Sequence, residues 1–105
     1  MAYVRFEWDE RKNSLNKRKH GISFEEASTC FEDDFAEVFH DGGHSDGEDR
    51  SILIGMSLIL NTVVVVFTER VKGNGKEVAN RIISARKATK NEFQYYWTRR
   101  KGLIQ

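Results

Sequence analysis

Four consecutive valines, Val63 to Val66, are the feature that most constrains how this chain can fold. β-Branched side chains favour strands, and a strand with one face in water alternates apolar and polar residues. An unbroken apolar run instead predicts a strand that is covered on both faces. We therefore expect Val63–Val66 to lie in a central strand of a sheet.

Further strand-like runs surround this segment and are separated by turn signals. Asn61 and its neighbours suit a tight hairpin, and the Lys-Gly-Asn-Gly-Lys stretch at 72–76 suits a longer one. Consecutive antiparallel strands joined by such turns form a meander. The sequence predicts strands at residues 3–8, 36–39, 50–56, 62–68 and 78–85.

The first of three helices is predicted between Asp9 and Gly21. The Asp9 carboxylate can cap the first turn, and Gly21 suits the left-handed position that ends a helix. Leu15 is the one large apolar residue between them. This helix should therefore be short and mostly in contact with water.

Two capping boxes predict where the other helices begin. In Ser23-Phe-Glu-Glu26 and in Thr89-Lys-Asn-Glu92, the hydroxyl and the carboxylate can each accept from an otherwise unpaired backbone N–H. Each helix then carries an apolar stripe that should face the sheet, formed by Phe24, Ala27 and Phe31 in one and by Phe93, Tyr96 and Trp97 in the other. The predicted order is β-α-α-β-β-β-β-α, which is typical of an α+β domain with helices packed against a small, twisted antiparallel sheet.

The composition narrows the class of protein. The 105 residues include no proline and no low-complexity linker, so residues 1–105 are expected to form a single domain. The longest apolar run, Val63–Phe67, is far shorter than the roughly 20 residues that span a bilayer. The N-terminal residues lack the layout of a signal peptide, and Cys30 is the single cysteine, so no intramolecular disulfide can form. We expect a cytoplasmic protein without membrane contact.

The formal net charge is +1, but the charges are unevenly distributed along the chain. Residues 1–20 carry six Lys or Arg and three Asp or Glu, and residues 51–105 carry ten and three. Residues 21–50 carry ten acidic residues and one base, Arg50. Two basic ends around an acidic middle can present a strongly positive face, or the segments can pack side by side and neutralise each other.

At a series of ordered positions the sequence resembles the BrnT toxins of type II toxin–antitoxin systems. The matching segments are Phe6-Glu-Trp-Asp9, Lys12-Asn13, Asn16-Lys17, Lys19-His-Gly-Ile-Ser-Phe-Glu-Glu-Ala27, Phe31, Asp33, Glu48 with Arg50, Gly55, the Val-Val-Val-Phe-Thr-Glu-Arg run that ends at Arg70, and Arg81-Ile-Ile-Ser-Ala-Arg-Lys-Ala88. Each segment is weak alone, but the ordered set covers nearly the whole chain.

The resemblance implies a fold and a function that composition alone does not. BrnT toxins belong to the RelE-like ribonuclease superfamily, so the resemblance implies cleavage of RNA and arrest of translation. It also implies a BrnA-like antitoxin with a ribbon-helix-helix part that binds operator DNA, so that the toxin meets DNA only through the antitoxin. The family commonly forms complexes of two toxins with two antitoxins.

RNA cleavage without a metal ion needs a base for the ribose 2′-OH, positive donors for the crowded phosphorane and an acid for the 5′-oxygen. Arginine suits the second task, because its planar fork holds phosphate and stays charged. We predict that Arg81 and Arg70 contact phosphate, with a surface ion pair as the alternative for each. Glu69 is a candidate base or an ion-pair partner, and Glu48 is predicted to orient an arginine.

Other candidates have weaker support. His20 can act as acid or base near neutral pH, or it can cap the end of the first helix. Tyr95 can stack on a base, or it can be a half-buried surface tyrosine. The residues predicted to bind RNA are Lys19, Arg50, Arg86, Lys87 and Tyr95. No metal or other cofactor is expected, because His40, Asp41, His44 and Asp46 adjoin or lie in a glycine-rich loop at 41–49 and match no compact zinc pattern.

Strand alternation limits which arginines can act together. In a regular strand Arg81 and Arg86 lie on opposite faces, and so do Glu69 and Arg70. Arg81 and Arg86 reach one site only if Arg86 lies beyond the strand or a bulge intervenes. Arg86 can otherwise anchor the final helix.

Two further functions stay open from the sequence. The chain can be an inactive module that binds RNA or the antitoxin and represses the operon as a co-repressor. A DNA-binding regulator is disfavoured, since no helix-turn-helix recognition helix is evident. The enzyme hypothesis requires Arg70, Arg81 and a base such as Glu69 or His20 to converge on one phosphate.

Overall fold

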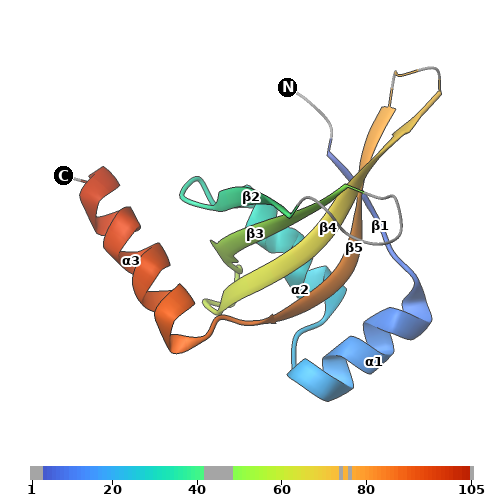
Figure 1. Cartoon of the computed structure of the whole chain (residues 1–105). Helices are drawn as coiled ribbons and strands as arrows, with labels where there is room; N and C mark the ends of the chain where they lie inside the picture. The colour runs from blue at the N-terminus through green and yellow to red at the C-terminus, as the bar shows by residue number, and fades with distance from the viewer. Residues whose placement is uncertain (1–3, 42–48, 74, 76, 105) are drawn as a thin grey trace.

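The computed structural model describes residues 4–41, 49–73, 75 and 77–104, which form a five-stranded sheet with helices around it (Figure 1). In chain order the elements are β1 (Arg5–Glu7), α1 (Glu10–His20), α2 (Phe24–Thr29), the short 3-10 helix η1 (Cys30–Glu32), β2 (Glu37–Asp41), β3 (Arg50–Met56), β4 (Thr62–Lys72), β5 (Glu77–Lys87) and α3 (Lys90–Ile104). The predicted α+β class and succession of elements are present, with η1 as an addition between α2 and β2.

The strand order in the sheet is β1-β5-β4-β3-β2, so β4 with its valine run lies at the centre, as predicted. Neighbouring strands from β2 to β5 are antiparallel, but β1 pairs in parallel with β5, with Glu7 opposite Arg81. The sheet is therefore mixed, and the prediction of a wholly antiparallel sheet is wrong for β1. No hairpin joins β1 to β5, so no turn determines the direction of β1.

A β-bulge in β5 changes which side chains share a face. Val66 pairs with Ser84 and Phe67 pairs with Ile82, so Ile83 is an extra residue that faces no position on β4. The alternation of side chains along β5 shifts by one residue at this point. Residues that would point to opposite sides in a regular strand therefore point to the same side.

The bulge places Arg81 and Arg86 on one face of the sheet. Arg81 pairs with Thr68 and Arg86 pairs with Val64, and these two partners are four residues apart on β4, on the same side of that strand. The bulge alternative therefore holds, and the regular alternation is wrong for β5. We call this side of the sheet the open face, and the side covered by α2 the helical face.

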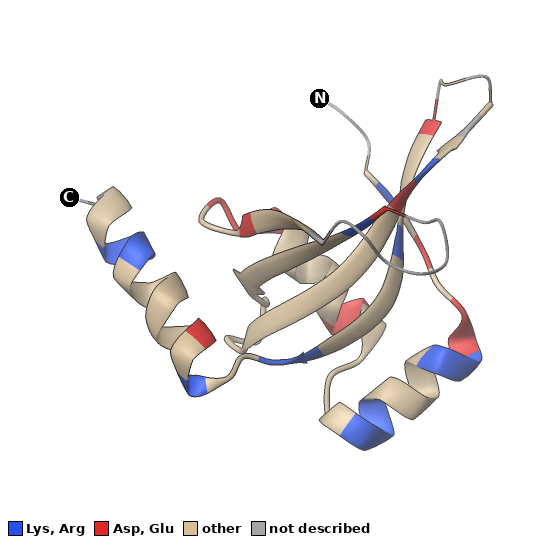
Figure 2. Cartoon of the chain, in the orientation of Figure 1, with Lys and Arg blue, Asp and Glu red and all other residues tan. Residues whose placement is uncertain are grey.

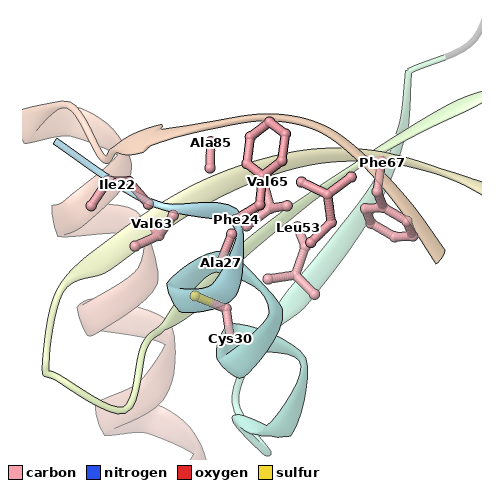
Figure 3. Packing of buried hydrophobic residues seen from close by; sticks show 10 residues of the cluster. Ile22, Phe24, Ala27, Cys30, Leu53, Val63, Val65, Phe67 and Ala85 are labelled. Carbon is pink, nitrogen blue, oxygen red and sulfur yellow. The ribbon is translucent and has the colours of Figure 1, made fainter. Parts of the chain in front are cut away.

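The main hydrophobic core lies between the helical face and α2 with η1 (Figure 3). Side chains from α2 meet those of β3, β4 and β5, and full burial of each large apolar side chain contributes roughly 1.5–3 kcal/mol. The buried members are Ile22, Phe24, Ala27, Cys30, Leu53, Val63, Val65, Phe67, Ile82 and Ala85. Phe31 packs edge-on against Phe67, with ring centroids 4.9 Å apart.

The start of α2 is capped by Ser23, whose hydroxyl accepts from the backbone N–H of Glu26 at 3.0 Å. The Glu26 carboxylate does not complete the predicted capping box. It accepts instead from the Ser57 hydroxyl and from the Asn61 side-chain amide, each at 2.7 Å. These bonds tie α2 to the turn between β3 and β4.

Asparagine side chains attach α1 to the rest of the fold. Asp9 caps the helix and Gly21 ends it with a φ of 76°, both as predicted. Leu15 is 52% exposed, whereas Asn16 is buried. The Asn16 amide donates to the carbonyl of Ala85 at 2.7 Å and accepts from the N–H of Ala85 at 3.2 Å. Asn16 therefore satisfies the outer edge of β5 beyond the residues that pair with β1.

The C-terminal helix α3 lies at the opposite end of the molecule from α1 (Figure 1) and packs on the open face. Thr89 and Glu92 form the predicted capping box in full, with backbone N–H groups donating to both side chains at 3.2 and 2.8 Å. Tyr96 is buried against β3 and β4, and Trp97 donates to the hydroxyl of Thr62. Phe93 is 48% exposed, so this member of the predicted stripe does not dock.

Candidate functional site

Three arginines gather around Thr68 on the open face. Arg81 is the cross-strand partner of Thr68 on β5. Arg50, the first residue of β3, lies at the same level on the other side of Thr68, whose hydroxyl donates to the carbonyl of Asp49 at 2.9 Å. Arg70 follows two residues later on β4, on the same face. Neighbouring strands are about 4.8 Å apart and rise about 3.4 Å per residue, so the Cα atoms of all three arginines lie within roughly 10 Å of the Cα of Thr68. We call Arg50, Arg70 and Arg81 the arginine cluster.

A carboxylate that the sequence did not single out, Glu7, joins this cluster. Glu7 faces Arg81 across the parallel pair of β1 and β5. Its Oε1 lies 3.9 Å from Nε of Arg70, and the two side chains are 24% and 44% exposed. Glu7 lies in the family-matching segment Phe6–Asp9, but its place beside Arg70 and Arg81 depends on the parallel pairing of β1 with β5, which no local pattern indicates.

Glu69 lies on the other side of the sheet. It points to the helical face, where it is the cross-strand partner of Asn80, so Glu69 and Arg70 point in opposite directions as the alternation predicts. Both border an open cleft of about 960 Å³, with Phe31 and Phe67 among its lining residues. The structure therefore does not bring Glu69 to the arginine cluster as a base.

Arg86 shares the open face with Arg81 but has a structural partner. Two of its nitrogens donate to the two carboxylate oxygens of Glu92 at 2.7 and 3.0 Å. Hydrogen bonding to Arg86 lowers the pKa of Glu92 to about 2, and the same contact raises the pKa of Arg86. Since Glu92 also caps α3, this pair joins the end of β5 to the start of α3, which matches the anchoring alternative for Arg86.

His20 and Lys19 end α1, far along β5 from the arginine cluster. Asn16, one turn before His20, is held at Ala85, four residues from Arg81. Figure 2 shows several Lys and Arg positions along α1, and their side chains are exposed. Lys87 is exposed at the end of β5. The structure does not bring His20 together with Arg70 and Arg81, and it leaves Lys19 and Lys87 on the surface.

Tyr95 is half-exposed on α3 and lies against β2. Its ring centroid is 6.0 Å from that of Phe39. A hydrogen bond to Glu37 raises the pKa of the Tyr95 hydroxyl. Arg99 forms an ion pair with the same carboxylate at 2.8 Å. Tyr95 thus belongs to the contact between α3 and β2.

Several other expectations concern groups away from the arginine cluster. Cys30 is buried in the core, and burial raises the pKa of its thiol to about 12, so it is not a reactive nucleophile. Among the described residues no group of three or more metal-binding side chains is present, and no helix is long and apolar enough to span a membrane. His44, Asp46 and Glu48 lie outside the described residues.

Comparison with known proteins identifies a matching family and a similar solved structure. Residues 8–92 match a family described as the ribonuclease toxin BrnT of type II toxin–antitoxin systems. Among solved structures, the chain is similar to the crystal structure of the ribonuclease toxin BrnT from Brucella abortus, with a TM-score of 0.56 and 26% sequence identity. This similarity covers 85% of the present chain and 100% of the Brucella chain. Among proteins with curated descriptions, none matches.

Proposed function

Because this chain belongs to the BrnT family of ribonuclease toxins of type II toxin–antitoxin systems, we propose that it cleaves RNA at the arginine cluster without a metal ion. The observation that carries this proposal is the convergence of Arg81, Arg70 and Glu7 on the open face, beside Thr68. Arginine forks suit a phosphate, and a carboxylate beside them can accept a proton.

The proposed reaction is an attack by the ribose 2′-oxygen on the adjacent phosphorus. Glu7 accepts the proton of the 2′-OH, and the guanidinium groups of Arg81 and Arg70 stabilise the negative charge that develops on the phosphorane oxygens. The bond from phosphorus to the 5′-oxygen then breaks, and that oxygen takes a proton from water. The products are a 2′,3′-cyclic phosphate and a 5′-hydroxyl.

Glu7 replaces Glu69 and His20 as the base in this proposal. Glu69 lies on the helical face, and α1 holds His20 near the other end of β5. Glu7 lies opposite Arg81 and within 3.9 Å of Arg70. It is therefore the carboxylate that the register of the sheet supports for proton transfer at a phosphate held by both arginines.

The experiment is cleavage of a mixed-sequence RNA by the purified full chain with a chelator present. Arg81→Ala should slow cleavage by about a hundredfold to a thousandfold, the usual effect of removing one donor to a developing oxyanion. Arg18→Ala, which removes an exposed arginine on α1, should cleave at the wild-type rate. Cleavage that needs an added divalent ion, or equal rates for both variants, contradicts the proposal.

The family also implies an antitoxin partner. We propose a BrnA-like antitoxin with a ribbon-helix-helix part, a complex of two toxins and two antitoxins, and contact with operator DNA only through the antitoxin. The cellular result of RNA cleavage is arrest of translation in the cytoplasm. Mass measurement of the co-expressed complex by light scattering tests the stoichiometry, and a DNA-binding assay with the toxin alone should show no operator binding.

A further inference from the structure

The cleft on the helical face is adjacent to the arginine cluster but is lined by different kinds of side chain. The cleft has a volume of about 960 Å³ and combines aromatic side chains, Phe31 and Phe67, with polar ones, Glu69, Asn80 and Ser51. Arg70 of the cluster also borders it. Clefts with an apolar surface and a few convergent polar groups are the usual form of a ligand site.

Two polar side chains in this cleft stand side by side and have no partner among the described residues. Glu69 and Asn80 are opposite each other on β4 and β5, which places their Cβ atoms about 5 Å apart. Within the part of the chain that the structure describes, neither side chain has a hydrogen bond or an ion pair. Asn80 is half-buried. A half-buried amide without a partner lowers stability unless water or a ligand satisfies it.

Among the described residues, the β3 side of β4 carries no paired strand where Glu69 and Arg70 lie. Pairing between β3 and β4 ends with Ser51 opposite Phe67. Beyond Thr68, β4 therefore has no neighbour on that side among the described residues. An extended RNA chain can pass this edge with its phosphate at Arg70 on the open face and its base at Glu69 on the helical face.

We propose that this cleft is a guanine-recognition subsite for the RNA substrate, with Glu69 and Asn80 as its specificity-determining residues. The inference rests on the proposed function for its substrate class. A negatively charged carboxylate repels phosphate, so the group that enters the cleft is a base.

Guanine matches this pair of side chains better than the other bases do. Its Watson–Crick edge carries two adjacent donors, N1–H and the N2 amino group, and one acceptor, O6. A carboxylate accepts both donors in a bidentate contact, and the Asn80 amide can donate to O6. Adenine, cytosine and uracil each place an acceptor where guanine has one of these donors, and that acceptor would face a carboxylate oxygen. The accessible part of the Phe31 ring offers a surface for stacking.

The first test is binding of the four ribonucleoside 3′-monophosphates to the full chain, followed by NMR chemical shifts. Wild type should bind 3′-GMP most tightly. Glu69→Gln and Asn80→Ala should each weaken 3′-GMP by about tenfold to a hundredfold, as for loss of one bidentate base contact, and should leave 3′-UMP unchanged. Glu77→Gln is the matched control, since it removes a carboxylate from the same hairpin at a position paired with Arg5 on the open face. Equal binding of all four nucleotides, or undiminished 3′-GMP binding by Glu69→Gln, overturns the proposal.

The second test is mapping of cleavage sites on RNA. Glu69→Gln should lose a preference for sites next to guanine while total cleavage continues, whereas Arg81→Ala should lose cleavage at all sites alike. A guanine preference that persists in Glu69→Gln overturns the subsite. If wild type cleaves no RNA but still binds 3′-GMP through Glu69, the proposed cleavage fails and the subsite stands. Glu69 is exposed, so this variant is expected to fold even if Asn80→Ala does not.

Discussion

The two ends of β5 each carry an arginine on the open face, and the two arginines have different surroundings. Arg86 is held by both oxygens of Glu92, at the junction with α3. Arg81 has no ion pair within the part of the chain that the structure describes. One end of the strand is thus a structural joint with its charges satisfied, and the other end carries the guanidinium group that we propose binds phosphate. The difference shows that arginines of one strand and one face need not share a role.

The two roles are tested most directly by exchanging each arginine for methionine, which keeps much of the unbranched stem of the side chain and removes its charge. Arg81→Met should lower kcat/KM for RNA cleavage by about a hundredfold to a thousandfold and leave the unfolding midpoint unchanged. Arg86→Met should lower the unfolding midpoint and leave kcat/KM for RNA cleavage unchanged. Cleavage kinetics and thermal unfolding of both variants decide the matter, and a loss of activity in Arg86→Met at a temperature where it is folded contradicts the division of roles.

The structural end of β5 should also depend strongly on Asn16. Asn16→Ala removes its bonds to the backbone of Ala85 and leaves a buried carbonyl and N–H unsatisfied. We expect a loss of about 2–3 kcal/mol in the free energy of unfolding. Leu15→Ala, at the exposed neighbouring position, should change it by less than about 0.5 kcal/mol. Urea denaturation measures both, and equal losses would mean that α1 is attached by apolar contact.

Local signals predicted the helix starts and the central strand well. The Thr89–Glu92 capping box, the cap at Asp9 and the central valine strand follow from neighbouring residues and strand or helix periodicity. The role of Asn16 did not, because an asparagine in a polar helix resembles any exposed residue until its partner strand is known. Its partner Ala85 lies 69 positions away in the chain.

The candidate site depended on long-range pairing, which the sequence does not encode locally. Arg81 and Arg70 were predicted to contact phosphate and do lie on one face, but whether Arg86 shares that face depended on a bulge at Ile83 that no turn residue marks. Glu7 was missed since its place beside Arg81 requires β1 to run parallel to β5. Asn80 was missed for the same kind of reason, because only the register of the β4–β5 hairpin places it opposite Glu69.

The joint between Arg86 and Glu92 should produce a dependence of stability on pH. The folded-state pKa of Glu92 is lowered from 4.5 to about 2, chiefly by hydrogen bonding to Arg86. A carboxyl with a lowered pKa contributes stability above its unfolded value, and this contribution is lost as pH falls from about 4.5 towards 2. Because Arg86 is 42% exposed, solvent screening limits the effect to about 1 kcal/mol.

Glu92→Gln isolates this contribution. The variant should be less stable than wild type at pH 7 and should approach it at pH 2.5, where the wild-type carboxyl has lost most of its advantage. Denaturation at both pH values provides the measurement. Arg81→Met should show the wild-type dependence on pH, and a difference between wild type and Glu92→Gln that stays constant with pH would exclude the ion pair as the cause.

The smallest effect is expected from an exposed ion pair near the arginine cluster, between Arg5 and Glu77. Arg5 and Glu77 lie 2.8 Å apart, but their side chains are 52% and 54% exposed. An exposed pair of this kind contributes between about 0 and 1 kcal/mol, so Arg5→Ala should change the free energy of unfolding by less than about 0.5 kcal/mol and its dependence on salt by little. Urea denaturation at low and high salt tests this. A large loss at low salt would mean that ion pairs stabilise the Arg81 end of β5 as they stabilise the Arg86 end. The proposed contrast between the two ends of the strand would then be wrong.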